Sequence, residues 1–315
     1  MDKYNTAIRR TLRAILSRLI TYILLQASPQ VTRYPKPQVD LAYPLIDQPS
    51  TMLSPLTALT LALTATTTTA KILWDGRANG QTSSAFLSQW SWSNQVGPYQ
   101  YYIHGPEPVT RYVKLQEGFK SPHDAGSKRG FQLTVDSTSK WNGQSMLRTE
   151  LIPQTTAPIN KGKVFYHFSM QYAPGNAAAA DEEHQICFFE SHFTEMRFNP
   201  GSRKLHWYAD GKAHWTSIFD LSKGLWHNIA YGIDFDAGTV TYYHSTGAEK
   251  LEKLAGPIKV SASSNGQDWH LGVLRLPSQS GAAPKAENWK FSGVYIEDGP
   301  LTLKASSPGG AKARK

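Results

Sequence analysis

The sequence predicts an all-β fold, an antiparallel β-sandwich of the jelly-roll (concanavalin-like) type, over residues 71–303. Short alternating or apolar runs begin at Lys71, and no stretch shows sustained helical periodicity. Turn signals such as Asn142-Gly143 and Asp210-Gly211 separate the runs at hairpin-like spacing. Ten or more such strands in a region of this length favour a jelly roll over an immunoglobulin-type sandwich.

The predicted strands follow from β-branched and aromatic residues that alternate with polar ones or form short apolar runs. They are Gly130–Val135, Met146–Leu151, Lys163–Tyr172, Gln185–Glu190, Glu195–Phe198, Leu205–Tyr208, His227–Phe235, Thr239–His244, His270–Leu276 and Lys290–Glu297. The Ala177–Ala180 run is predicted as a loop. No internal repeat and no second domain are indicated.

The basic charge belongs to the ends of the chain. The sequence holds 33 basic and 24 acidic residues, a formal net charge of +9. Seven basic and three acidic residues precede residue 71, and four basic residues follow residue 303. The region 71–303 therefore has 22 basic and 21 acidic residues. Nucleic-acid binding needs positive charge clustered on the fold itself, so we expect no nucleic-acid partner.

We predict that both terminal segments lie outside the fold. Residues 1–51, basic and then proline-rich, are predicted to be a non-native or disordered extension; a signal anchor or transit segment at 1–26 is the alternative. Residues 52–70 have an apolar stretch followed by small residues and are predicted as a signal peptide, although a basic start is missing. Residues 304–315 are predicted to be a disordered basic tail. We therefore expect a secreted, extracellular monomer without stable membrane association after signal cleavage.

Composition alone leaves several functions open. All nine Trp and all ten His fall within 71–303. Indole and phenol rings stack on sugar rings, but they also fill β-sandwich cores. The single cysteine, Cys187, lies in an apolar run, so it excludes an intramolecular disulfide and is expected to be a buried, inert thiol.

Arg148 and Glu150 form the first candidate site, because residues two apart on a strand share a face. Glu190 ends an apolar run, where partial desolvation would raise its pKa as a general acid requires. His192 would share the face of Glu190 if the strand continued, and Glu195 could equally be a surface charge.

His270 begins an apolar strand, with Arg275 facing away from it by parity. A salt-bridged exposed strand, a solvated strand edge and a structural histidine remain ordinary explanations for these patterns. Two carboxylates with a histidine and an arginine on neighbouring strands would nevertheless meet the needs of glycoside hydrolysis. We expect no metal and no cofactor, although Glu190-Ser191-His192 leaves a weak metal site open.

The sequence resembles the fungal β-glucanases of glycoside hydrolase family 131 over nearly all of residues 71–303. The matching segments are Ile72–Arg77, Trp90–Tyr99, Trp141–Gln144, Arg148–Gln154, Asn160–Lys163, His184-Gln185, Phe188–Glu195, Trp226–Asn228, Asp268–Pro277 and Phe291–Ile296. The resemblance implies a β-jelly roll with a broad open cleft. It also implies inverting hydrolysis of β-1,3-, β-1,4- and β-1,6-glucans.

The family's functional cleft residues correspond to Arg148, Glu150, Glu190 and His270, which we predict to be catalytic. One glutamate would be the acid. The other, or His270 with it, would activate water, and Arg148 would hold a carboxylate ionised. Predicted sugar contacts, chosen within or beside the matching segments, are Trp92, Tyr99, Tyr101, Gln144 and His192.

Two alternatives stay open at this point. A polysaccharide lyase on the same fold would use Arg148 to neutralise a uronate. A non-catalytic lectin would keep the aromatic residues but would not need Glu150 and Glu190 to face each other.

Overall fold

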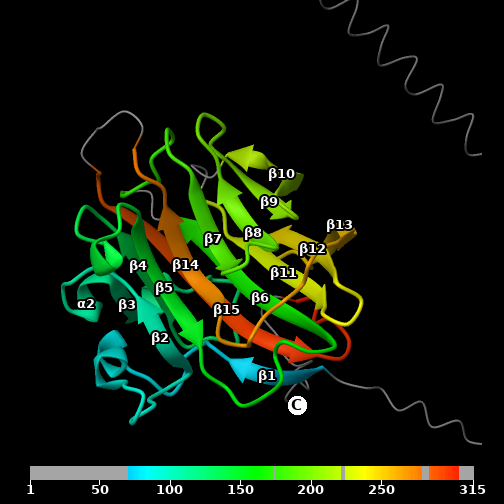
Figure 1. The fold of residues 1–315 in the computed structure, drawn as a ribbon, viewed down its shortest axis with the longest axis horizontal. Helices are drawn as coiled ribbons and strands as arrows, with labels where there is room; N and C mark the ends of the chain where they lie inside the picture. The colour runs from blue at the N-terminus through cyan, green and yellow to red at the C-terminus, as the bar shows by residue number, and fades with distance from the viewer. Residues whose placement is uncertain (1–69, 173–174, 221–223, 279–283, 305–315) are drawn as a thin grey trace, which may run out of the picture. The chain divides into compact units, whose positions relative to one another are not determined.

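The computed structural model describes residues 70–304 except 173–174, 221–223 and 279–283 (Figure 1). These residues all fall within one compact unit of the chain. The predicted extension, nearly all of the signal peptide and nearly all of the basic tail lie outside the described residues. Among those described, no helix is long and apolar enough to cross a membrane.

The described residues form two antiparallel sheets, which confirms the predicted β-sandwich. The first sheet has the order β13-β12-β11-β6-β15-β4-β3, with β1 paired to β15. Its strands are β1 (Lys71–Asp75), β3 (Val113–Gln116), β4 (Gly130–Val135), β6 (Lys163–Tyr172), β11 (His227–Asp234), β12 (Thr239–Thr246), β13 (Glu252–Lys259) and β15 (Glu287–Asp298).

The second sheet carries the predicted site and has the order β10-β9-β8-β7-β14-β5-β2. Its strands are β2 (Tyr99–Ile103), β5 (Leu147–Pro153), β7 (His184–Phe189), β8 (Thr194–Phe198), β9 (Lys204–Ala209), β10 (Lys212–Asp220) and β14 (Trp269–Arg275). Strand β14 therefore lies between β5 and β7, although it follows β7 by about eighty residues of chain.

Each predicted strand is present within two or three residues of its expected ends, and Ala177–Ala180 is a loop. The prediction missed β1, β2, β3, β10 and β13. Strand β13 is exposed along most of its length and lies at a sheet edge, so it lacks the apolar alternation on which the prediction depended. Strand β3 does alternate, but it has only four residues.

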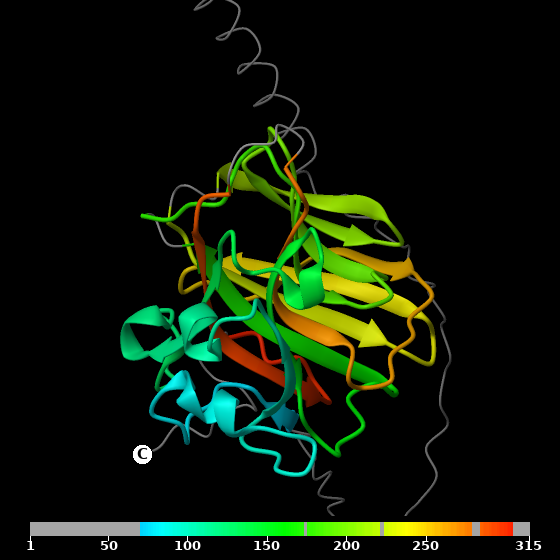
Figure 2. The same cartoon turned by 60° about the vertical axis from the view of Figure 1, so that its left-hand side comes forward.

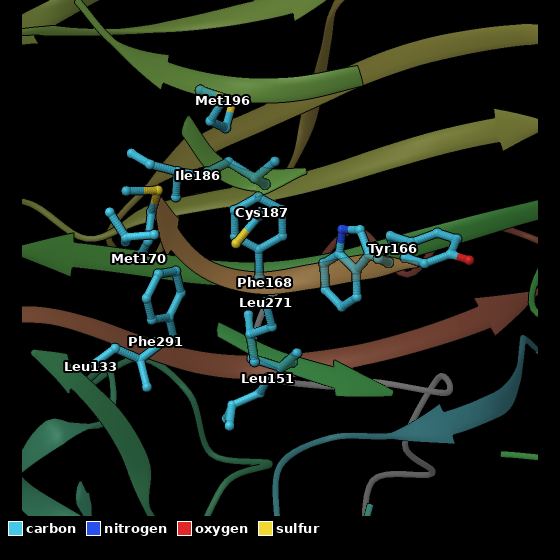
Figure 3. Close-up of a cluster of buried hydrophobic side chains, with 14 of the residues drawn as sticks. Leu133, Leu151, Tyr166, Phe168, Met170, Ile186, Cys187, Met196, Leu271 and Phe291 are labelled. Atoms are coloured by element: carbon cyan, nitrogen blue, oxygen red, sulfur yellow. The ribbon is translucent and has the colours of Figure 1, made fainter. Parts of the chain in front are cut away.

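Apolar side chains from both sheets pack between them (Figure 3). Phe168 of β6 and Phe291 of β15 come from the first sheet, and Leu151 of β5 and Leu271 of β14 come from the second. Each is at most 1% exposed, and burying such a side chain contributes roughly 1.5–3 kcal/mol. Cys187 lies in the same core with its pKa raised by burial, as expected of an inert thiol.

Alternation along β5 decides which side chains leave the core. Leu147, Thr149 and Leu151 face the first sheet, so Arg148 and Glu150 project from the opposite face. All seven residues of β5 are nevertheless buried. The outer face of this strand is therefore covered by other protein groups, which is unusual for charged residues on a sheet surface.

Short helical segments connect the early strands (Figure 2). They are η1 (Ser84–Gln89), α2 (Val109–Tyr112), η2 (Glu117–Phe119) and η3 (Trp141–Gly143). The first two pack against each other and against β3. The segment η3 directly precedes β5, and Asn142 within it has a positive φ of 48°, a conformation that asparagine tolerates. This turn brings Trp141 to the outer face of β5.

Candidate active site

The four predicted catalytic residues meet on the outer face of the second sheet. Arg148 and Glu150 come from β5, His270 from β14, and Glu190 from the turn after β7. In the register, Gly272 pairs with Glu150, and His270 pairs with Phe188. The backbone N–H of Glu190 donates to the carbonyl of Asp268 at 2.9 Å, which fixes the turn beside β14.

One imidazole joins the two glutamates. Arg148 donates from Nε and Nη2 to the two oxygens of Glu150 at 2.8 and 2.9 Å, a bidentate ion pair. His270 Nδ1 lies 2.6 Å from Glu150 Oε2, and its Nε2 lies 3.1 Å from Glu190 Oε2. An ionised carboxylate only accepts hydrogen bonds, so both ring nitrogens carry a proton when both glutamates are charged.

The charge on His270 follows from these contacts. Burial alone would lower the pKa of His270, because it penalises the cation. The hydrogen bonds that His270 donates to Glu150 and Glu190 outweigh burial and raise the pKa to about 8. Phe188 stacks on the imidazole at 4.6 Å between ring centroids and holds its plane. At neutral pH the site therefore contains a buried imidazolium between two carboxylates.

The prediction that desolvation raises the pKa of Glu190 was wrong. The residue follows the last residue of β7, and its side chain is 68% exposed. Its pKa is lowered, chiefly by the hydrogen bond from His270, and the charges of His270, Arg148 and His192 add to this. The apolar run before Glu190 predicted desolvation, but the turn points the carboxylate outward.

His192 also departs from the predicted geometry, because β7 ends at Phe189 and the strand does not continue. The residue has a positive φ of 53° in the β7–β8 turn. Its ring stacks on the second face of Phe188, and its Nδ1 lies 2.8 Å from Glu195 Oε2. Glu195 itself is fully buried, which decides against the surface charge that the sequence left open.

The other predicted sugar contacts lie in different environments. Gln144 accepts a hydrogen bond from Arg148 Nη1 at 3.3 Å, so it borders the site. Trp92 is 68% exposed and packs on Trp90. Tyr99 is wrong as a sugar contact: it is fully buried, and its hydroxyl donates to the carbonyl of Gly76. The backbone of Tyr101 pairs with Ile152, and its side chain lies outside the described residues.

A pocket of about 660 Å³ lies beside Arg148, although none of the four residues lines it. The Trp141 ring lies 6.0 Å from the Arg148 guanidinium carbon and forms part of its wall. On the other side Tyr102 and His104 stack on each other, and Tyr102 also contacts Trp90. The prediction did not include these aromatics, although Trp90 and Trp141 stand in the segments that carried the family resemblance.

None of the predicted catalytic residues lines the second hollow, of about 390 Å³, near the β10 and β12 ends of the sheets. Within the described ranges, no group of three or more His, Cys, Asp or Glu side chains is placed to hold a metal ion. Arg275 faces away from His270, as parity predicted, and pairs with Glu182 and Glu287. The predicted catalytic side chains therefore lie together around His270.

Comparisons with known proteins identify the family of the chain that carries this site. A family model described as the glycoside hydrolase 131 catalytic N-terminal domain matches residues 72–302. The crystal structure of a family 131 β-glucanase catalytic domain from Podospora anserina is 53% identical, with a TM-score of 0.72, and covers 75% of this chain and 100% of its own. The catalytic domain of a family 131 protein from Coprinopsis cinerea is 43% identical, with a TM-score of 0.70, and covers 76% and 100%. A search of curated proteins found no match.

Proposed function

The chain belongs to glycoside hydrolase family 131 and is a β-glucanase; we propose that it hydrolyses β-1,3-, β-1,4- and β-1,6-linked glucans with inversion, outside the cell. The observation that carries the proposal is the exposed carboxylate of Glu190, hydrogen-bonded to a buried imidazolium at 3.1 Å. This pair places a transferable proton where a polysaccharide can reach it. The segment 52–70 supports secretion.

Glu190 and His270 together supply the acid. A bound glucan desolvates the Glu190 carboxylate and so raises its pKa toward that of the imidazolium. The proton on Nε2 then moves along the existing hydrogen bond to Glu190, which delivers it to the glycosidic oxygen as the C1–O bond breaks. His270 becomes neutral in this step and regains its proton from solvent after the products leave.

Glu150 and Arg148 act through His270. Glu150 has no exposed surface, and its oxygens are bonded to Arg148 and to the imidazole. Its charge keeps Nδ1 protonated and fixes the ring, as the carboxylate partner of a catalytic histidine does in hydrolases. Arg148 balances the buried carboxylate, because an unpaired charge there would cost several kcal/mol. We therefore assign both as positioning residues.

The pocket beside Arg148 supports an extended substrate. Trp141, Tyr102 and His104 offer aromatic surface along it, and Trp92 lies exposed at the end of the Tyr102–Trp90–Trp92 row. Sugar rings stack on such surfaces through their C–H faces, whatever linkage joins them. This broad aromatic surface favours recognition of the glucan chain over recognition of one linkage, and it supports action on several β-linkages.

The test is Glu190→Gln, assayed for reducing ends on laminarin, mixed-linkage glucan, pustulan and carboxymethylcellulose. We expect hydrolysis to fall at least ~10³-fold, because the amide cannot carry the proton. Glu117→Gln, on an exposed glutamate of η2, is the matched control and should keep full activity. Near-normal turnover by Glu190→Gln would refute the assignment. Unsaturated products from glucuronan, without hydrolysis of any glucan, would indicate a lyase instead.

A further inference from the structure

Hydrolysis by inversion requires a proton acceptor as well as the proton donor. The attacking water must lose a proton on the face of the sugar opposite the leaving group. Glu150 is poorly placed for this step, since it has no exposed surface and both its oxygens accept charged hydrogen bonds. Glu190 is occupied with the leaving oxygen. The acceptor must therefore be sought among the other groups that reach the same face of the second sheet.

A second Arg–Glu–His set lies beside the first one. Arg197 of β8 donates from Nε and Nη2 to Glu195 Oε1, at 2.8 and 2.5 Å. The other carboxylate oxygen, Oε2, lies 2.8 Å from His192 Nδ1. This repeats the connection from Arg148 through Glu150 to His270. In both sets the carboxylate is fully buried and meets the Nδ1 atom of the histidine.

The two imidazoles stack on opposite faces of one ring. Phe188 lies 4.6 Å from His270 and 5.1 Å from His192, centroid to centroid, and both pairs are within about 12° of parallel. The two distances place the imidazoles within about 10 Å of each other. Glu190, the acid assigned above, lies two residues before His192, and the charge of His192 contributes to lowering the pKa of Glu190. The proposed acid and His192 therefore lie near one another, as an inverting glycosidase requires of its acid and base.

The second set differs from the first in its exposure. The His192 side chain is 40% exposed, whereas that of His270 is 5% exposed. Across the described part of the chain, no hydrogen bond to His192 Nε2 is present, while His270 Nε2 is bonded to Glu190. The buried carboxylate of Glu195 accepts a hydrogen bond from Nδ1–H, so Nδ1 keeps the proton of a neutral His192. Nε2 then presents its lone pair to the substrate side.

A contribution to folding stability does not explain why Glu195 is buried. Bringing an ion pair out of water costs about as much as its attraction returns, so such pairs are weak contributors to stability. Arg197 is further held by Glu183 at 3.1 Å and lies over the Tyr208 ring at 4.3 Å. These contacts hold the Glu195 carboxylate in place, and the carboxylate in turn fixes the ring and the tautomer of His192. This is the usual role of a carboxylate that is hydrogen-bonded to a catalytic histidine.

We propose that His192 is the catalytic base of this enzyme and that Glu195 and Arg197 are its positioning residues; the proposal rests on the function proposed above. A water molecule between Nε2 and the anomeric carbon gives its proton to Nε2 while its oxygen bonds to C1. The C1–O bond to the leaving sugar breaks at the same time, and that oxygen takes the proton of Glu190. His192 returns its proton to solvent, so atoms and charge balance.

The first experiment is chemical rescue of His192→Gly on mixed-linkage β-glucan with sodium azide. Glycine suits the positive φ of this turn and leaves room for the anion. We expect hydrolysis to fall ~10²- to 10⁴-fold, and azide to restore turnover with an α-glycosyl azide as product, seen by mass spectrometry and NMR. Azide needs no base and enters from the face that the water uses, which gives the α-anomer from a β-linkage.

His192→Asn is the second variant, because asparagine also tolerates this backbone and cannot act as the base. His206→Ala is the matched control: it is a partly buried histidine of β9 whose Nδ1 bonds to the Thr216 hydroxyl and not to a carboxylate. We expect the control to keep its activity and to form no glycosyl azide. Near-normal hydrolysis by folded His192→Gly or His192→Asn, or a loss without any azide product, would overturn the proposal.

The second experiment asks whether Glu195 acts through His192. Glu195→Gln should lower kcat about 10- to 100-fold with little change in KM. In a His192→Gly background the same change should have no further effect, because coupled residues are not additive. A fall of equal size in both backgrounds would show a purely structural glutamate and contradict its assignment as a positioning residue.

The failure of this inference and that of the proposed function can be told apart. Glu190→Gln should still cleave 2,4-dinitrophenyl β-cellobioside, whose leaving group needs no acid, whereas His192→Gly should lose this activity as well. If Glu190→Gln hydrolyses glucan normally, the proposed function fails whatever His192 does. If only the His192 results disagree, the acid assignment stands and the base is another group.

Discussion

Glu150 and Glu190 bond to opposite nitrogens of the same imidazole, yet their side chains are 0% and 68% exposed. The ring of His270 thus connects a carboxylate that substrate cannot touch with one that it can. This asymmetry gives the two glutamates different tasks. In the mechanism proposed above, Glu150 sets the charge and orientation of the ring, and Glu190 carries the proton to the glucan.

Replacing Glu150 by Gln should lower kcat about 100-fold or more and reduce the pKa of His270 below its value of about 8. The hydrogen bond that His270 donates to Glu150 is the largest contribution that raises this pKa, and the substitution removes the charge that accepts it. The pKa can be measured by NMR titration of the imidazole. Glu297→Gln, which alters a buried Glu–His pair in the first sheet, is the control and should leave His270 unchanged. An unaltered His270 pKa in Glu150→Gln would contradict this role.

The rate should fall as the pH rises through about 8. His270 must hold the proton that Glu190 delivers, and its pKa of about 8 marks where that proton is lost. The measurement is the pH profile of kcat/KM on laminarin. A profile that stays flat from pH 7 to 10 would exclude His270 from the proton path.

Stability should also decrease across the same alkaline range. The pKa of His270 is higher in the folded state than the usual 6.5, so its contribution is fully present below pH 6.5 and is lost as the pH passes about 8. A shift of this size corresponds to about 2 kcal/mol. Urea unfolding at pH 6 and pH 9 measures it, with His270→Gln as the reference. An equal pH dependence in both proteins would show that other groups are responsible.

Gly272→Ala should damage the site from the neighbouring strand. A Cβ atom there would lie 2.6 Å from the Cα of Glu150 and closer still to the Thr149 carbonyl oxygen, so β5 must move. We expect activity to fall ~10-fold or more and stability to fall by roughly 1–3 kcal/mol. Gly118→Ala, where a Cβ atom meets nothing within 4 Å, is the control and should behave as wild type. Unchanged kinetics in Gly272→Ala would mean that Glu150 tolerates the shift.

Trp92→Ala should raise KM several-fold on long glucans and leave kcat almost unchanged. The ring is exposed beside Trp90, so its loss removes sugar stacking without touching the proton pathway. Ile218→Ala, at a still more exposed position beside the other hollow, should not change KM. Initial rates on laminarin and on short oligosaccharides measure both. A kcat effect with an unchanged KM would assign Trp92 a different role.

Much of this enzyme could be predicted from local patterns. Alternation along residues 147–151 placed Arg148 and Glu150 on one face of a strand, since side-chain direction depends only on the backbone period. Apolar runs located the inner strands, while the exposed strand β13 left no pattern to recognise. The segments that resemble family 131 included every residue that bonds to His270.

Burial, partnership and charge were decided only by the tertiary structure. The sequence presented Glu190 as a partly desolvated acid and left open whether Glu195 is a surface charge; the fold exposes the first and buries the second. Tyr99 likewise stands in a segment that resembles family 131 but lies in the core. The pKa of a side chain depends on groups brought close by strand pairing, here across 120 residues between Glu150 and His270. Local sequence sets where a side chain points, whereas the strands packed around it set what that side chain meets.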